Sequence, residues 1–427
     1  MTRALILGAG VSGQAAADLA DRLGISTVIY DESPQSTVTA VGRSVATGAW
    51  DPTLLDGMEL VIASPGFSER SGPIVDALEA GIEVWSEIEF ASRHESGPIA
   101  AITGTNGKTT VTEAASAMLQ ASGLVAPAVG NIGSPMSAEV GGQVDCLVVE
   151  VSSFQLRFTD RFHPRAAAIT NVAVDHLDWH GSEFAYRQAK KRIYANQTKD
   201  DLLVFDADDP GATQLASAAT SRLLPVSGHR VPADGAGVAG GKLTVGDASV
   251  EITDLASTDS TLLVNLAIAA GVALEMGASP EGVLDAARSF RRGSHRRELI
   301  LEADEVRWVN DSKATNPHAA AASIDSNQPV VLIAGGQSKG LDVGVLADHP
   351  GVRILLGIGE SGPDLVERAG AKGRLAENLE TAVEMARELA RPGETVLLAP
   401  GCASFDQFDS YAERGARFKE LVMGVRR

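Results

Sequence analysis

Short apolar runs alternate along the chain with longer amphipathic stretches. The apolar runs include ALILG, STVIYD, ELVIAS, IAAIT, DCLVVE, AAAITN, LLVF, PVVLIAGG, RILLGIG and ETVLLAPG. Buried strands of a parallel sheet read as continuous apolar runs, and each needs a crossover segment, usually a helix, to reach the next strand. The pattern therefore predicts an α/β fold with mainly parallel sheets.

Two interruptions divide this pattern. The polar stretch 94–98 precedes a new strand at Ile99, and the basic stretch FRRGSHRRE at 290–298 separates an alanine-rich helix from the strand EVRWVN. We therefore predict three domains: a Rossmann-like domain over 1–93, a central P-loop-type domain over 94–290 and a second Rossmann-like domain over 291–427. Within the central domain, we expect a glycine-rich loop at 234–241, followed by a hairpin-like pair of strands.

Composition narrows the class of protein. The 427 residues carry a net charge of −19, which disfavours nucleic acid and anionic membranes as partners. An anionic substrate would therefore need local basic pockets. The two cysteines, Cys146 and Cys402, argue against a disulfide framework and a cysteine zinc site. With no apolar stretch of membrane-spanning length, we expect a soluble protein of the reducing cytoplasm.

A glycine pattern follows the first predicted strand. Gly8, Gly10 and Gly13 open a helix, and Asp31 ends the next strand, as a ribose-binding acid does in dinucleotide sites. Glycines at a helix N-terminus let backbone N–H groups approach a pyrophosphate. The pattern predicts a nucleotide site for NAD or another nucleoside diphosphate, while the turn at 64–66 either lines this site or is a plain turn.

The segment AITGTNGKTTVTEAASAML combines a strand, a glycine loop and a helix. In this arrangement backbone N–H groups surround ATP phosphates, Lys108 neutralises phosphate oxygens and Thr109 holds magnesium. Ile102 stands where the strict pattern has its first glycine, so the loop is a variant that depends on Gly104 and Gly107. We predict ATP binding here.

Further polar groups follow apolar strands. Glu150 ends CLVVE, where a carboxylate is costly unless it binds a metal or a donor, and a hard oxygen ligand near ATP favours magnesium. His176 and Asp178 follow AAAIT at the kind of sheet edge where ligands bind, although a lone histidine there is more often structural. Lys190 and Lys191 lie on a predicted helix, and the residues alone single out neither.

Eight motifs occur in order over most of the chain: GTNGKTT, EVSSFQL, NVAVDHLDWH, YRQAKKRIY, SHRRE, NDSKATNP, GGQSKGLD and PGCASFDQF. This succession resembles the Mur ligase family, and SSFQL with SFDQF resembles its D-glutamate-adding branch. The resemblance implies an ATP-dependent ligase that adds D-glutamate to UDP-N-acetylmuramoyl-L-alanine in peptidoglycan precursor synthesis. Such a reaction passes through an acyl phosphate and needs charge neutralisation more than covalent catalysis by the protein.

The resemblance also implies roles around ATP. The catalytic set is Lys108, Glu150, His176, Lys190 and Lys313. Two magnesium ions would be held by Thr109, Glu150, His176 and a carbamylated Lys190, since a carbamate turns a cation into an oxygen ligand. The implied ATP-binding residues are Gly104, Thr105, Asn106, Gly107, Lys108, Thr109, Thr110, Asn265, Arg296 and Asp311. Leu262 departs from the family, which has a second asparagine there.

The other two substrates receive residues in the same way. The resemblance implies a UDP-substrate site of Val11, Ser12, Asp31, Ser64, Gly66, Asn131 and Gly133, and a D-glutamate site of Thr315, Lys339, Ser404, Phe405 and Tyr411. Ser33 replaces an arginine of the family, whereas Phe405 and Tyr411 replace a leucine and a phenylalanine without removing a donor. We expect Asn316 to cap a helix that starts at Pro317.

Three other interpretations stay open at this point. Another Mur-type or folylpolyglutamate-type ligase would share the phosphate loop but should lack GAGVSG or SSFQL. A nucleotide-binding regulatory protein would not need the full phosphoryl-transfer set, and a dehydrogenase rests on GAGVSG alone. We expect a monomer that takes small-molecule substrates, inserts into no membrane and closes its C-terminal domain on ATP and substrate.

Overall fold

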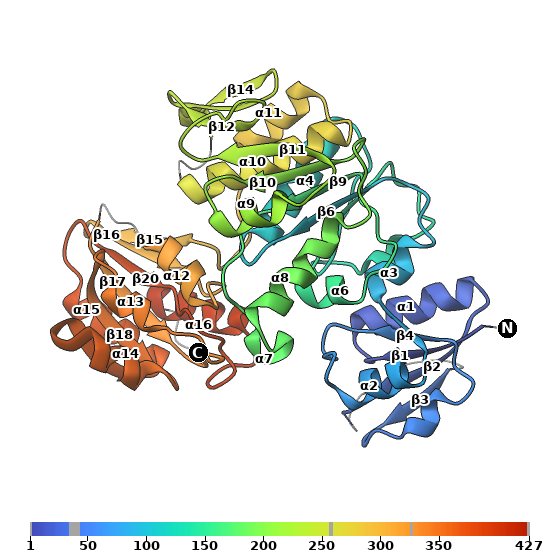
Figure 1. Ribbon diagram of the computed structural model, residues 1–427. Helices are drawn as coiled ribbons and strands as arrows, with labels where there is room; N and C mark the ends of the chain where they lie inside the picture. Colours follow the sequence, from blue (N-terminus) through green and yellow to red (C-terminus); the bar gives the residue numbers. More distant parts are fainter. Residues whose placement is uncertain (1, 34–42, 256–258, 325–327, 425–427) are drawn as a thin grey trace. The chain divides into compact units, whose positions relative to one another are not determined.

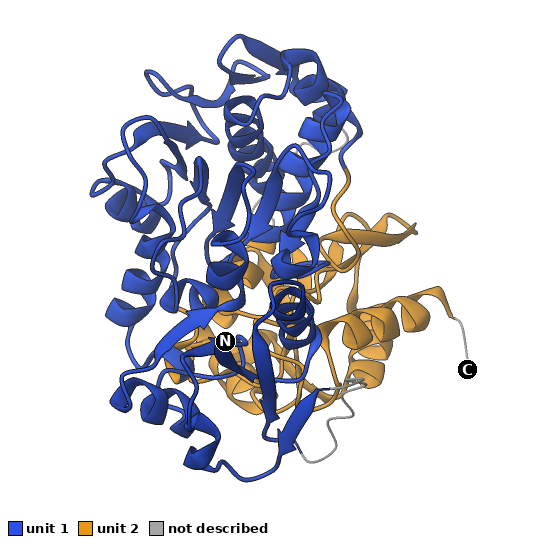
Figure 2. Ribbon diagram, turned by 90° about the vertical axis from the view of Figure 1, so that its right-hand side faces the viewer, with its two compact units in different colours: residues 1–174, 179–290 blue, residues 175–178, 291–427 orange. Residues whose placement is uncertain are grey.

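The computed structural model describes residues 2–33, 43–255, 259–324 and 328–424, which form three sheets (Figure 1). The chain divides into two compact units, residues 1–174 with 179–290 and residues 175–178 with 291–427 (Figure 2). The first unit contains two of the sheets and the second contains the third. The α/β class with mostly parallel sheets is confirmed, and the division into three domains stays a prediction.

The first sheet has five parallel strands in the order β3-β2-β1-β4-β5. The strands are β1 (Arg3–Leu7), β2 (Ser26–Asp31), β3 (Ser44–Thr47), β4 (Leu60–Ala63) and β5 (Glu83–Ser86). They are connected through helices α1 (Val11–Arg22) and α2 (Gly72–Glu79) and a short 3-10 turn (Pro52–Leu55), and α3 (Glu87–Ser92) follows β5. Since β2, β1 and β4 are neighbours, their carboxyl ends meet at one sheet edge.

The second sheet has nine strands in the order β14-β13-β12-β11-β10-β9-β6-β8-β7. Its parallel strands are β6 (Ile99–Thr103), β7 (Ala128–Gly130), β8 (Leu147–Glu150), β9 (Ala166–Ile169), β10 (Leu202–Asp206) and β11 (Arg222–Ser227). Strand β12 (Ala236–Ala239) runs parallel to β11, and β13 (Lys242–Val245) and β14 (Ala248–Glu251) follow antiparallel. The hairpin is confirmed, but the expected loop at 234–241 is wrong because β12 occupies its middle.

Helices of different lengths accompany the second sheet. The two longest, α4 (Lys108–Ala121) and α10 (Ser260–Glu275), pack on each other. Helix α11 (Pro280–Ser289) packs against both of them. The shorter ones are α5 (Met136–Glu139), α6 (Ser153–Arg157), α8 (Glu183–Lys191) and α9 (Pro210–Ala216), whereas the residues of α7 (Leu177–His180) are divided between the two compact units. Helix α10 is apolar nearly all round because it is covered by α4 on one side and by strands on the other.

The third sheet has six strands in the order β15-β16-β20-β17-β18-β19. Strand β15 (Glu298–Ala303) is antiparallel to β16 (Val306–Asn310), while β20 (Thr395–Leu398), β17 (Val330–Gly335), β18 (Val352–Ile358) and β19 (Gly373–Glu377) are parallel. The helices are α12 (Pro317–Ser323), α13 (Gly344–Asp348), α14 (Gly362–Ala369), α15 (Leu379–Leu389) and α16 (Tyr411–Met423). The carboxyl ends of β16, β20 and β17 are therefore neighbours.

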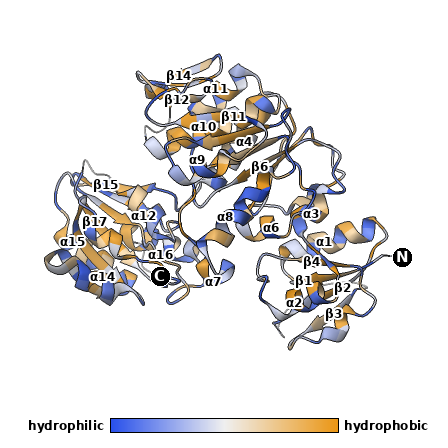
Figure 3. Ribbon diagram, viewed as in Figure 1, coloured by the Kyte–Doolittle hydropathy of each residue, from blue (hydrophilic) through white to orange (hydrophobic). Residues whose placement is uncertain are grey.

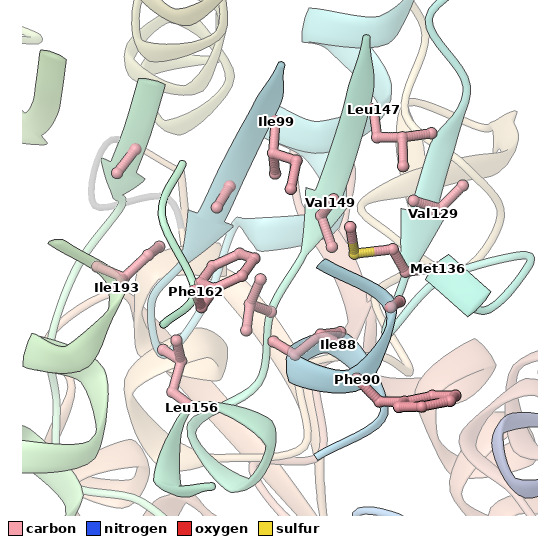
Figure 4. Close-up of a cluster of buried hydrophobic side chains, with 14 of the residues drawn as sticks. Ile88, Phe90, Ile99, Val129, Met136, Leu147, Val149, Leu156, Phe162 and Ile193 are labelled. Atoms are coloured by element: carbon pink, nitrogen blue, oxygen red, sulfur yellow. The ribbon is translucent and has the colours of Figure 1, made fainter. Parts of the chain in front are cut away.

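Apolar residues concentrate on the strands, whereas outer helices such as α14 carry hydrophilic residues (Figure 3). One buried cluster in the first unit draws Ile88 and Phe90 from α3 together with Ile99, Val149 and Phe162 of the second sheet and its loops (Figure 4). This cluster also includes Ile6 and Ile62 of the first sheet, so α3 shares its packing with both sheets. Among the described residues, no helix has the length and apolarity needed to cross a membrane.

Candidate functional site

The phosphate loop lies between β6 and α4 of the second sheet. Gly107 precedes the helix in a left-handed conformation at φ +83°, and Gly104 has φ +155°. A Cβ at Gly104 would lie 1.8 Å from Thr170 Oγ1, so only glycine fits there. A glycine start leaves the first N–H groups of α4 without a capping side chain, which suits an anion.

Contacts from β9 and its following loop hold the phosphate loop in shape. The Asn171 side chain accepts a hydrogen bond from Asn106 N at 2.9 Å and donates to Asn106 O at 3.1 Å. Thr105 N donates to Asn171 O, and the Thr105 hydroxyl contacts Ala173 and, at 2.9 Å, the Tyr186 hydroxyl. Asn171 and Tyr186 were missed from the sequence, although Tyr186 lies four residues before Lys190 in YRQAKKRIY.

Two lysines point at the same carbonyl of this loop. Lys108 Nζ donates to Gly104 O and to Thr105 O, both at 2.9 Å, and Lys190 Nζ donates to Gly104 O at 2.7 Å. Lys190 is 1% exposed and its Nζ lies 4.6 Å from the centre of the Tyr186 ring. The structure thus singles out Lys190 by its burial and its contact with the loop, which the residues alone did not.

The other expected ATP residues of this unit lie close to the loop. Thr109 and Thr110 are buried in the first turn of α4. Asn265 of α10 is beside Gly107, because a Cβ at that glycine would meet the Asn265 Oδ1 atom at 2.9 Å. Leu262 is buried in the apolar cluster under α10, and its backbone N–H is capped by Asp259, so this helix start is built for packing.

Glu150 ends β8 beside Ile102 of β6, next to the phosphate loop. Its Oε1 accepts a hydrogen bond from Asn131 Nδ2 at 2.8 Å, while its Oε2 is buried and has no hydrogen-bond partner among the described residues. A buried carboxylate oxygen left in this state fits a cation. Asn131, expected at the UDP-substrate, thus contacts Glu150, and Gly133 follows in the same loop with φ +59°.

The remaining expected metal ligand belongs to the second compact unit. His176 lies in the short segment 175–178, with φ +52°, and its N–H donates to Asp175 Oδ1 at 2.8 Å. Its ring is half-buried, and Nε2 lies 3.7 Å from Asp175 Oδ2. The four residues expected to bind magnesium are therefore divided, with Thr109, Glu150 and Lys190 in the first unit.

The glycine turn of the first sheet, residues 8–10 between β1 and α1, is shorter than the phosphate loop at 104–107. A Cβ at Gly13 would lie 1.9 Å from Gly8 O, and one at Gly8 would lie 2.8 Å from Ser64 Oγ. Asp31 accepts hydrogen bonds from Ala9 N at 2.7 Å and from Ser33 N at 2.9 Å. The turn, Asp31 and Ser64 therefore share one edge.

The other residues expected at the UDP-substrate lie on the same two connections. Ser12 is in the first turn of α1, Gly66 follows Ser64 after β4, and Val11 is 72% exposed. An exposed apolar side chain beside a helix N-terminus is available to a ligand ring.

The edge of the third sheet brings together the groups expected at D-glutamate and at the ribose. Asp311 to Thr315 follow β16, Ser404 and Phe405 follow β20, and Lys339 follows β17 with φ +54°. Lys313 Nζ lies 4.8 Å from the centre of the Tyr411 ring at the start of α16. Ser404 is buried, whereas Phe405 is 66% exposed.

Asp311 is buried at this edge, and one nitrogen of the partly exposed Arg296 is buried as well. Asp311 accepts hydrogen bonds from Arg297 N at 3.2 Å and from the Ser323 hydroxyl, and burial raises the pKa of its carboxyl despite these donors and the nearby Arg297. The Arg296 Nη2 atom is buried without a hydrogen-bond partner among the described residues. Asn316 caps α12 through Ala319 N, as expected, and Pro317 starts that helix.

Comparisons with known proteins agree with this architecture. Family models match in order: the Mur ligase MurD-like N-terminal domain over 2–86, the Mur ligase middle domain over 102–255 and the Mur ligase glutamate ligase domain over 295–402. The chain belongs to the Mur ligase family.

Two relatives that match nearly the whole chain are both named as the D-glutamate ligase. The chain is 36% identical to the UDP-N-acetylmuramoylalanine–D-glutamate ligase of Pelotomaculum thermopropionicum, over 100% of this chain and 98% of the relative. It is 39% identical to that of Frankia casuarinae, over 98% and 93% of the two chains. A pseudomurein peptide ligase type C from Methanothermus fervidus has the same fold, with a TM-score of 0.63 at 17% identity over 100% of both chains.

Proposed function

We propose that this chain is an ATP-dependent amide-bond ligase that joins D-glutamate to UDP-N-acetylmuramoyl-L-alanine in peptidoglycan precursor synthesis. The reaction class is supported by the phosphate loop, where Lys108 begins a helix that starts after a glycine. Beside this loop, Glu150 at the end of β8 has a buried oxygen with no hydrogen-bond partner among the described residues. The identity of the two substrates is supported by the full-length likeness to the named D-glutamate ligases.

Three sheet edges then serve three ligands. In this proposal the first edge, with Asp31 and the Gly8 turn, takes the UDP group, and the second takes the ATP phosphates. The third edge, with Lys313, Lys339 and Ser404, takes D-glutamate, whose two carboxylates need cations and hydroxyls. Domains over 1–93, 94–290 and 291–427 are the corresponding division, and closure of the C-terminal domain would complete the site.

In this reaction the protein stabilises the transferred charge with its own charged groups and forms no covalent bond to the substrate. An alanyl carboxylate oxygen attacks the γ-phosphorus and ADP leaves; the amine nitrogen of D-glutamate then attacks the acyl carbon, and phosphate leaves with the bonding electrons as the amine loses its proton. Lys108 places a cation at the transferred phosphoryl group. Asn265 contacts the loop from α10 and would meet the nucleotide, together with Arg296 and Asp311.

Magnesium fits the donor set of the second sheet edge. Glu150 offers a buried carboxylate oxygen, Thr109 a hydroxyl at the helix start and Lys190 a buried nitrogen that carbamylation would turn into two oxygen donors. His176 completes the proposed set for two ions. When bound, the metal would neutralise the phosphate oxygens. We further propose a monomer that works in the cytoplasm.

The test of the proposed function is phosphate release from ATP in the presence of UDP-N-acetylmuramoyl-L-alanine. D-glutamate is compared with L-glutamate, L-alanine, L-lysine and diaminopimelate. Release that depends on D-glutamate alone is the expected result. Release with another amino acid would keep the ligase chemistry and reject the proposed D-glutamate site, and release with none would reject the ligase.

The carbamate has its own test. We expect Lys190→Ala to lose activity and to regain part of it when short-chain carboxylic acids are added, because a small carboxylate can occupy the place of the carbamate. Lys191→Ala is the matched control, since the neighbouring lysine is partly exposed and, among the described hydrogen bonds, Lys190 and not Lys191 reaches Gly104 O. Full activity of Lys190→Ala without added acid would contradict the proposed role.

A further inference from the structure

The turn that carries Arg296 has a strained backbone. His295 and Arg297, on either side of Arg296, have φ values of +63° and +50°. Left-handed backbone is unfavourable for residues with a Cβ, so two such residues around one arginine persist only if surrounding contacts hold them. The structure shows which contacts do so.

The Asn310 side chain is the centre of these contacts. Its Nδ2 lies 2.9 Å from His295 Nδ1 and donates to Gly415 O at 3.0 Å, while its Oδ1 accepts from Ser312 N at 3.1 Å. An amide nitrogen only donates, so His295 Nδ1 must accept and the ring proton must lie on Nε2. Asn310 therefore selects one neutral tautomer of His295.

The charges that face His295 do not replace this contact. Glu298 Oε2 lies 3.9 Å from His295 Nδ1 and favours the protonated ring, whereas Lys419 and Lys313 oppose it. Burial has the largest effect, and it lowers the pKa of His295. The lowered pKa favours the neutral ring, which the hydrogen bond from Asn310 requires.

Gly415 on α16 provides the space for the ring. A Cβ at this position would lie 2.3 Å from His295 Nδ1 and 2.8 Å from Cγ, and the ring is not the far end of a flexible side chain. Helix propensity alone favours alanine over glycine in the middle of a helix. The glycine is therefore explained by the close approach of His295.

The locked histidine in turn ties the arginine turn to the end of β16. His295 O accepts from Lys313 N at 3.2 Å, and Arg297 N donates to Asp311 Oδ1 at 3.2 Å. Between these two attachments, Arg296 Nη2 is buried with no hydrogen-bond partner among the described residues. This nitrogen therefore has a hydrogen-bond donor left for a bound acceptor.

We propose that Asn310 and Gly415 are positioning residues that lock His295 in one tautomer and one place, and thereby aim Arg296 and Asp311 at the nucleotide. Neither residue touches the nucleotide in this proposal. It rests on the proposed function, because that function supplies the nucleotide. A misplacement of about 1 Å in a positioned group can cost on the order of 100-fold in rate.

The first experiment compares Gly415→Ala with Gly293→Ala. The control adds the same methyl group two residues before His295, at a position outside α16 where a Cβ meets no atom within 4 Å. We expect Gly415→Ala to raise the Kd for a non-hydrolysable ATP analogue about 10-fold, with Gly293→Ala unchanged and the affinity for UDP-N-acetylmuramoyl-L-alanine unchanged in both. An unchanged Kd in a folded Gly415→Ala protein would overturn the proposal.

The second experiment decides the case even where Gly415→Ala does not fold. Asn310→Asp keeps the shape but presents an acceptor to His295 Nδ1, which favours the protonated ring and raises its pKa. We expect the variant to bind the analogue more weakly at pH 8 and to regain part of the affinity as the pH falls to 6. The protonated ring then donates to the introduced carboxylate in place of the lost bond, while the donor to Gly415 O stays absent. A constant variant-to-wild-type ratio across this range would contradict the tautomer lock.

Because binding of the ATP analogue is measured without turnover, it tests the positioning role independently of the ligase reaction. If wild type binds the analogue but releases no phosphate with any amino acid, the proposed function fails while the positioning role can still be measured. If wild type turns over and both variants keep their analogue affinity at every pH, the positioning role fails and the ligase stands.

Discussion

The molecule uses the same strand, glycine turn and helix twice in its first unit, at β1–α1 and at β6–α4, and the two turns differ in how they are held. In the first, Gly13 lies against Gly8 O, and Asp31 from the next strand accepts the Ala9 N–H. In the second, the loop is longer, two lysines reach Gly104 O, and Asn171 bonds both backbone groups of Asn106.

This difference separates binding from phosphoryl transfer. The first turn offers N–H groups and a carboxylate, which suffice to hold a nucleoside diphosphate. The second adds the positive charge of two lysines and, one strand away, a Glu150 oxygen with no hydrogen-bond partner in the described part of the chain. Positive charge and a metal-binding carboxylate are what a phosphoryl group in reaction needs. A glycine pattern by itself therefore indicates an anion site, and the charges around it indicate what happens there.

The largest effect should come from the second turn. We expect Lys108→Ala to lower kcat/KM by about 1,000-fold or more, because it removes the cation from the transferred phosphoryl group. The KM for UDP-N-acetylmuramoyl-L-alanine should stay unchanged, since its UDP group belongs to the first turn. Steady-state kinetics against Lys199→Ala, an exposed lysine, measures this, and an equal loss in the control would remove the distinction.

The first turn should show the opposite selectivity. Asp31→Ala leaves Ala9 N and Ser33 N without their acceptor, so we expect the KM for the UDP-substrate to rise about 10-fold. The KM for ATP should not change. Glu32→Ala is the control, because it removes one negative charge, as Asp31→Ala does, but from a neighbouring exposed side chain. Equal increases in both KM values would show that the two turns are not independent.

The smallest effect concerns stability. Asp206 ends β10 much as Asp31 ends β2, but it lies beside Asp208 and Asp209, and burial with these charges raises its pKa to about 6. A carboxyl with a raised folded-state pKa contributes stability below its unfolded value near 4, and this contribution is lost as the pH rises through about 6. At pH 8 the free energy of unfolding of Asp206→Asn should therefore exceed that of wild type by about 1–3 kcal/mol.

Urea unfolding at pH 4 and pH 8 checks this prediction. The gain of Asp206→Asn over wild type should vanish at pH 4, where both side chains are neutral or nearly so. Asp200→Asn is the control, since it removes an exposed carboxylate four residues after Asn196 and should be neutral at both values. The same gain at pH 4 and pH 8 would show that the charge of Asp206 is not what costs stability.

Local sequence pattern was sufficient for the long buried strands and for the loops that follow them. Strands such as β6 and β17 are continuously apolar because both faces are covered, and the phosphate loop and the Asn316–Pro317 helix start are set by nearest neighbours. The pattern missed β3, β5, β7, β11, β15 and β19, which are short or half-exposed and carry polar residues among the apolar ones.

Tertiary structure decided which polar side chains are buried and which groups they contact. Lys190 differs from Lys191 only because helix α8 turns it into the protein against Gly104, 86 positions earlier in the chain. Asn131 meets Glu150 because β7 pairs with β8, and Asn310 meets His295 and Gly415 because β16 lies between a strained turn and α16.

The sequence by itself determined the fold class, the phosphate loop and, through resemblance, the family. Only the folded chain shows which lysine is buried, which carboxylate oxygen lacks a partner and which glycine makes room for a histidine. The physical reason is range: apolar periodicity and loop chemistry act between neighbours along the chain, whereas burial and hydrogen bonding of a polar group depend on elements that meet only after folding.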